Sequence, residues 1–150
     1  MSLLKPLLTA CFYSLFIFSA YSAPILKNMN GETILFSELA GKWVFINYWA
    51  SWCGPCLDEI PVFNRFYEAH KKSIALFAVN YDALPENKQA TLIKKYNIRY
   101  PSLKEDPSGI LNLGDIRGVP ATFVFTPEGK FYDVLYGAQT QSSLNHILEE

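Results

Sequence analysis

Two of the three cysteines in this chain stand at a spacing that suits reversible disulfide chemistry. Cys53 and Cys56 enclose only Gly54 and Pro55, so a single helical turn brings both sulfurs within disulfide reach. A helix starting here would place Cys53 at its N-terminus, where the partial positive charge favours a thiolate over a thiol. Cys56, one turn further in, is placed to attack a mixed disulfide formed on Cys53. The spacing therefore indicates thiol–disulfide exchange.

Other uses of the cysteine pair fit the sequence less well. A zinc site needs four ligands, usually from two such pairs or from one pair and two nearby histidines. The chain has only His70 and His146, and neither has the spacing of a zinc finger, so we assign no metal ligand. A purely structural disulfide would close too short a loop to stabilise the fold much. Exchange chemistry at such a pair requires no metal, nucleotide or flavin cofactor.

The segments on either side of the pair predict a strand and a helix. Residues 43–50 are almost continuously apolar and aromatic, which is typical of a strand buried on both faces. Residues 56–72 repeat apolar side chains every three or four positions, as an amphipathic helix does. Phe63 should face the core and Asn64 the wetter side. Pro61 should kink the helix, because it removes one backbone hydrogen bond.

The rest of the chain alternates between strand and helix patterns. Further strands are expected at 33–36, 74–80, 121–125 and 131–136, a helical turn at 37–41, and helices at 85–96 and 141–149. Ala90, Ile93 and Tyr96 should face the core. Strands that alternate with helices imply a parallel βαβ unit, and the final hairpin adds antiparallel strands. The expected fold class is α/β, with a central mixed β-sheet flanked by helices on both faces.

Residues 1–23 predict an export segment. Lys5, its only charge, precedes an apolar run at 7–23 that ends in small residues, the pattern of a secretory signal peptide. The run is near the short limit for spanning a bilayer, so an N-terminal membrane anchor is the main alternative. Lipidation at Cys11 and a buried cytosolic helix are two further alternatives. Either main interpretation carries residues 24–150, one compact domain, into the periplasm.

Composition excludes several classes of protein. The 150 residues suit one domain, and 50% hydrophobic against 18% charged residues argues against disorder. Thirteen basic and fourteen acidic residues leave a net charge of -1. No strong positive field is available to attract nucleic acid, so we expect no nucleic-acid partner.

The cysteine segment also resembles a known family. Residues 49–56, WASWCGPC, are similar to the active-site segment of the thioredoxin superfamily. The wider sequence resembles the extracytoplasmic TlpA/ResA/CcmG (DsbE) thiol–disulfide oxidoreductases. The resemblance runs from about residue 24 to the C-terminus and includes LAGK at 39–42, NYW at 47–49, EIP at 59–61 and GVPATF at 118–123. It implies a thioredoxin-like fold for 24–150 and a thiol–disulfide oxidoreductase activity.

The same resemblance implies how a client would be bound. It places a cis peptide bond before Pro120, packed against the active-site disulfide, and leaves the backbone of Val119 free to pair with an extended client peptide. Gly54 and Pro55, between the cysteines, would also contact the client. Trp52 would offer an apolar surface beside Cys53.

Glu59 is the remaining candidate for a chemical role. It follows Cys56 by three residues and so shares its helical face, and ResA-type proteins carry a glutamate at this place that tunes the cysteines. The carboxylate could accept a proton from Cys56 if burial raised its pKa; the alternative is a solvated helix glutamate. Asn47 stands where cytosolic thioredoxins carry a buried acid, and Asp58 should point to another face.

The resemblance implies a reductant of disulfide-bearing periplasmic proteins, with oxidised apocytochrome c among the possible clients. A membrane reductant of the DsbD or CcdA type would reset the enzyme. Gly54 and Pro55 form the dipeptide of thioredoxin, which favours a reducing role. The alternative is an enzyme that forms or isomerises disulfides in exported proteins. A metal-binding chaperone of the Sco kind would need a C-x-x-x-C motif and a suitably placed histidine, which the sequence lacks.

Overall fold

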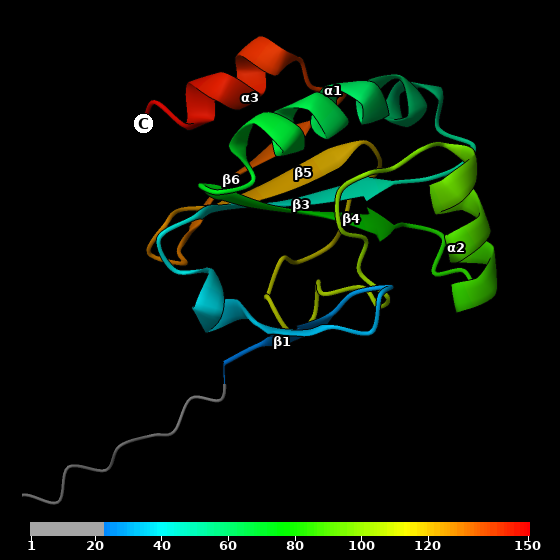
Figure 1. The fold of residues 1–150 in the computed structure, drawn as a ribbon, viewed down its shortest axis with the longest axis horizontal. Coiled ribbons are helices and arrows are strands. Elements are labelled where there is room, and N and C mark those ends of the chain that lie inside the picture. The colour runs from blue at the N-terminus through cyan, green and yellow to red at the C-terminus, as the bar shows by residue number, and fades with distance from the viewer. Residues whose placement is uncertain (1–22) are drawn as a thin grey trace, which may run out of the picture.

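The computed structural model describes residues 23–150 (Figure 1). The predicted signal peptide or anchor, 1–23, lies outside the described residues except for Ala23. Within 23–150, no helix combines the length and the apolar character needed to cross a membrane.

Four strands form the central sheet in the order β4-β3-β5-β6. They are β3 (Trp43–Trp49), β4 (Ile74–Asn80), β5 (Ala121–Phe125) and β6 (Phe131–Tyr136). β3 runs parallel to β4 and antiparallel to β5, which pairs antiparallel with β6. Helix α1 (Gly54–His70) is the crossover from β3 to β4 that a parallel pair requires. The predicted mixed sheet and α/β class are confirmed.

One face of the sheet carries the α-helices. α1 and α3 (Gln141–Ile147) lie side by side over this face, and α2 (Glu86–Lys95) lies at the β4 side (Figure 1). Phe63 and Phe66 of α1 are fully buried against the sheet, where Phe66 meets the ring of Phe45 edge-on. The same core includes both active-pair cysteines, so the packing that holds the sheet together also fixes the start of α1.

The other face has little helical cover. It packs against a short hairpin formed by β1 (Ile25–Lys27) and β2 (Thr33–Leu35), and against the 3-10 helix η1 (Phe36–Leu39). Loop side chains complete the layer, among them Leu111, Leu113 and Ile116. The helix expected on this second face is the 3-10 helix η1, and apolar loop residues complete the cover.

Four details of the predicted elements are corrected. Strand β1 was not predicted, since three residues carry too little alternation to register as a strand. α1 begins at Gly54, two residues before the predicted start, because Cys53 caps it. Ala90 is exposed, and the neighbouring Gln89 is buried instead, its amide donating to the carbonyl of Leu84 at 2.7 Å.

The fourth correction concerns Asn64, which is buried rather than on a wet face. Its amide donates to the carbonyl oxygen of Asn97 at 2.8 Å, and its oxygen accepts from the backbone N–H of Arg99 at 2.7 Å. The loop after α2 supplies these partners, which a helical pattern cannot reveal. Pro61 lies inside α1 without ending it, so the helix runs from Gly54 to His70.

Candidate active site

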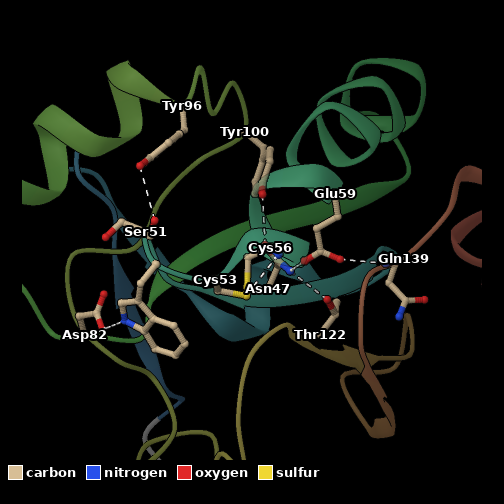
Figure 2. Close-up of a disulfide and its surroundings, with 11 residues drawn as sticks. Asn47, Ser51, Cys53, Cys56, Glu59, Asp82, Tyr96, Tyr100, Thr122 and Gln139 are labelled. Atoms are coloured by element: carbon tan, nitrogen blue, oxygen red, sulfur yellow. Dashed lines mark hydrogen bonds between the residues drawn. A yellow bond between two sulfur atoms is a disulfide. The ribbon is translucent and has the colours of Figure 1, made fainter.

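Cys53 and Cys56 form a disulfide at the start of α1, with their Cα atoms 5.3 Å apart (Figure 2). Cys53 is the N-cap residue, and its sulfur accepts a hydrogen bond from the backbone N–H of Cys56 at 3.2 Å. Cys53 keeps 5% of its surface exposed and Cys56 none. Cys53 is therefore the outer cysteine, the one that a client disulfide can approach.

The local sequence explains why α1 starts at this point. β3 ends at Trp49, and a short turn leads to Cys53. Pro55 occupies the first turn of the helix, where its missing N–H would have had no partner. The remaining free N–H groups of this turn and the helix dipole stabilise negative charge on the Cys53 sulfur once the disulfide opens. Gly54 and Pro55 are both exposed beside it.

Glu59 lies one turn beyond Cys56 and is almost completely buried, with 1% of its surface exposed. One carboxylate oxygen accepts from the side-chain amide of Asn47 at 2.8 Å, and the other from the backbone N–H of Gln139 at 2.9 Å (Figure 2). Burial raises the pKa of Glu59 to about 7, although both hydrogen bonds favour the ionised form. The carboxyl group can therefore both accept and release a proton near neutral pH.

Asn47 holds Glu59 in place. Its amide nitrogen also donates to the hydroxyl of Thr122 at 3.1 Å, and its oxygen accepts from the hydroxyl of Tyr100 at 3.2 Å. These contacts join β3, β5 and the loop after α2 around one carboxyl group. Within residues 23–150, Glu59 is the only buried acidic side chain. Asp58 is exposed, as expected from its place on the helix.

The peptide bond between Val119 and Pro120 is cis, as the family resemblance implied. Pro120 is buried, and Val119 packs against the core cluster that contains both cysteines. A hollow of about 370 Å³ opens beside this bond, lined by Arg117, Gly118, Val119, Pro120, Tyr136 and Gly137. Sequence reasoning did not single out Arg117 or Tyr136, because neither belongs to a motif.

Trp52 stands on the outer rim of the site with 66% of its surface exposed. Its indole N–H donates to the carboxylate of Asp82 at 2.7 Å, which orients the ring (Figure 2). Asp82 is thirty positions away in the chain, so no sequence pattern could have paired the two. Trp52, Gly54 and Pro55 thus adjoin the cysteine pair in the chain, and Val119 packs against the core cluster that contains both cysteines. The contact of these residues and Pro120 with a client is a proposal.

No group of three or more His, Cys, Asp or Glu side chains is placed to hold a metal ion in the part of the chain that the structure describes.

Comparisons with known proteins agree with this geometry. The AhpC/TSA family model matches residues 20–134. The thiol-disulfide oxidoreductase ResA of Bacillus subtilis (strain 168) is 34% identical over 127 residues, which cover 83% of this chain and 69% of ResA.

Two solved structures show the same fold. StoA from Bacillus subtilis has a TM-score of 0.68 at 25% identity, over 83% of this chain and 97% of StoA. A protein of Chlorobium tepidum assigned as the thiol:disulfide interchange protein DsbE has a TM-score of 0.69 at 27% identity, over 83% and 90% of the two chains.

A thioredoxin-like fold with a redox-active cysteine pair at a helix start defines a thiol–disulfide oxidoreductase. The chain belongs to the AhpC/TSA family, and ResA proteins are its homologues. The α/β fold, the family resemblance and the oxidoreductase activity inferred from the sequence are therefore confirmed.

Proposed function

We propose that this oxidoreductase reduces disulfides in client proteins outside the cytoplasm. The observation that carries the proposal is the pairing of an outer cysteine at a helix start with a buried carboxyl group one turn beyond the inner cysteine. ResA and DsbE, which this chain resembles, support an exchange reaction on protein disulfides. The predicted export segment at 1–23, as a signal peptide or an anchor, supports the location.

In the proposed cycle, the Cys53 thiolate attacks one sulfur of the client disulfide. The bond that forms joins Cys53 to the client, and the other client sulfur leaves as a thiolate that takes a proton from solvent. Glu59 then accepts the proton of the Cys56 thiol, and the Cys56 thiolate attacks the sulfur of Cys53. The second client thiolate leaves, so two electrons have passed from the cysteine pair to the client.

The client would bind as an extended segment against the loop before β5. Val119 precedes β5, which begins at Ala121, so its backbone lies outside the hydrogen-bonded ladder of the sheet. An extended peptide can pair with such a backbone edge while its cysteine meets Cys53. Trp52 and Pro55, both exposed, supply apolar contacts on the other side of the pair.

After each cycle the cysteines are oxidised and need two electrons from outside the protein. We propose a membrane dithiol reductant of the DsbD or CcdA type as the source, and apocytochrome c as one candidate client. An N-terminal segment that stayed uncleaved would hold the enzyme at the same membrane as such a reductant.

Insulin reduction tests the activity. The reduced protein with excess dithiothreitol should precipitate insulin chains much faster than dithiothreitol alone, and Cys53→Ser should abolish this acceleration. The control is Lys72→Ala, a change at an exposed residue beyond the end of α1. Equal rates for the wild type and Cys53→Ser would refute the reaction.

The redox potential tests the direction. Equilibration with glutathione buffers should give a value near the thioredoxin potential of about -270 mV, as expected for a reductant. A value near the DsbA potential of about -120 mV would instead support the enzyme that forms or isomerises disulfides. Clients trapped on Cys53 in a Cys56→Ala variant, and identified by mass spectrometry, would then define the substrates.

A further inference from the structure

The hollow beside the cis peptide bond contains one charged side chain. This charged side chain is Arg117. Tyr136 contributes an aromatic ring that is 48% exposed. Backbone and apolar surface come from Gly118, Val119, Pro120 and Gly137. Gly137 also donates its N–H to the carbonyl oxygen of Pro120 at 2.9 Å, which ties this wall of the hollow to the loop before β5. A client lying along Val119 would pass directly over the hollow.

The charge of Arg117 has no partner among the described residues. Its side chain is exposed and takes part in none of the ion pairs or side-chain hydrogen bonds formed within residues 23–150. A guanidinium group presents a planar fork of donors that matches a carboxylate in two-point contact. Arg117 therefore offers an unused anion-binding group within the surface where a client would lie.

A negative charge also lies near the cysteine pair. Asp82, held by the indole of Trp52, lies on one side of the disulfide, while Thr122 and Gln139 lie on the other (Figure 2). Pro120 and Gly137, which precede Thr122 and Gln139 by two residues each, line the hollow. A client therefore meets a carboxylate beside Trp52 and a guanidinium at the hollow, so an acidic client side chain is repelled at the first and attracted at the second.

We propose that Arg117 makes this enzyme select disulfides whose cysteine has an acidic side chain within two residues. The inference rests on the proposed reduction of client proteins and names the substrate class of the same site. Side chains of an extended segment alternate, so a residue two positions from the cysteine lies on the same side, about 7 Å away. An aspartate or glutamate there reaches the hollow while the client cysteine is bonded to Cys53.

Three disulfide-linked model peptides test the proposal. They differ only at the two positions that lie two residues before and after the cysteine, which carry glutamate, glutamine or lysine, and their termini are blocked. The pre-reduced, full-length protein is mixed with each peptide, and the rate constant of peptide reduction is measured at low and high salt. We expect the glutamate peptide to react about tenfold faster than the lysine peptide at low salt, with a smaller ratio at high salt.

Arg117→Gln should bring the glutamate-to-lysine ratio close to one, and Arg117→Glu should reverse it. Arg65→Glu serves as the matched control, since it changes the net charge equally at an exposed position of α1; it should keep the wild-type ratio. Equal rates of the wild type on all three peptides would overturn the selectivity while leaving the proposed function intact. A wild type that reduced none of the peptides, nor insulin, would overturn the function itself.

Discussion

Glu59 shows how burial and hydrogen bonding compete at a single carboxyl group. Two N–H donors, from Asn47 and Gln139, favour the carboxylate, whereas loss of water favours the neutral acid. Burial is the larger effect, so the pKa of Glu59 rises from its ordinary 4.5 to about 7. A proton acceptor with a pKa near the working pH transfers protons efficiently in both directions, which is what a reversible exchange reaction needs.

The raised pKa makes stability depend on pH. Between pH 4.5 and 7 the folded state keeps the Glu59 proton that the unfolded chain has lost, so the folded state binds more protons there. The free energy of unfolding therefore decreases as pH rises through this range, by about 3 kcal/mol for a shift of this size. Glu59→Gln cannot titrate and should lose most of this decrease.

Urea unfolding of the oxidised proteins at pH 4.5 and pH 8 measures the effect. The difference in unfolding free energy between the two values should be smaller for Glu59→Gln than for the wild type. Asp58→Asn, a change at the exposed neighbouring acid, should behave as the wild type does. An unchanged pH dependence in Glu59→Gln would show that Glu59 is not the group responsible.

The same titration should appear in the reaction. If Glu59 takes the proton of Cys56, the step that releases the client should accelerate as pH rises through about 7. Glu59→Gln should slow this step by about 100-fold and remove the inflection, since general-base assistance contributes at least that much. Rapid-quench measurement of the rate at which the mixed disulfide decays, over pH 5 to 9, checks this prediction. A slow but normally shaped profile would point to a structural effect alone.

At the scale of single residues, the sequence predicted contacts along one helix and missed contacts between elements. The helical spacing placed Glu59 on the face of Cys56, and the cysteine spacing gave the redox pair. Asn47 and Trp52 find their partners Glu59 and Asp82 only through the fold, at separations of 12 and 30 residues. Side-chain polarity alone could not indicate that Asn64 is buried, because its partners are backbone groups of a distant loop.

At the scale of elements, α1 is positioned by contacts at its start and along its first two thirds. Cys53 caps its start, Glu59 joins it to β3 through Asn47, and Asn64 bonds to the loop after α2. Among the short elements, the helical turn predicted at 37–41 corresponds to η1, whereas β1 was missed. β1 owes its conformation to the sheet face that it covers, and a three-residue segment has little pattern of its own.

Asn64→Ala should destabilise the protein by about 2 kcal/mol, because it leaves the carbonyl of Asn97 and the N–H of Arg99 without their partners in a partly buried setting. Urea unfolding at pH 7 measures the loss. Arg65→Ala, at the next and exposed position of α1, should change stability by less than about 0.5 kcal/mol. Equal effects of the two variants would contradict the role given to the Asn64 hydrogen bonds.

At the scale of the whole molecule, the described chain begins far from the helix that carries the active cysteines. Ala23 leads into β1, on the sheet face opposite α1 and α3 (Figure 1). A membrane anchor attached there would leave the start of α1 open to clients. Near-neutral overall charge, at -1, leaves client selection to local charges such as that of Arg117 rather than to a global field.

The proposed reduction of clients outside the cytoplasm requires that the chain be exported. If residues 1–23 carry the protein across the membrane, as proposed, a C-terminally tagged protein should be digested by protease added to spheroplasts. Phe16→Arg, which places a charge in the centre of the apolar run, should keep it protected inside the cell, since a charge there opposes insertion. The control Phe131→Arg alters an exposed residue of β6 and should leave export unchanged.

Mass spectrometry of the exported form then separates two outcomes. A chain that begins near residue 23 or 24 shows that a signal peptide has been cleaved, whereas an intact N-terminus in the membrane fraction shows an anchor. A wild-type protein protected from protease in intact spheroplasts would rule out clients outside the cytoplasm.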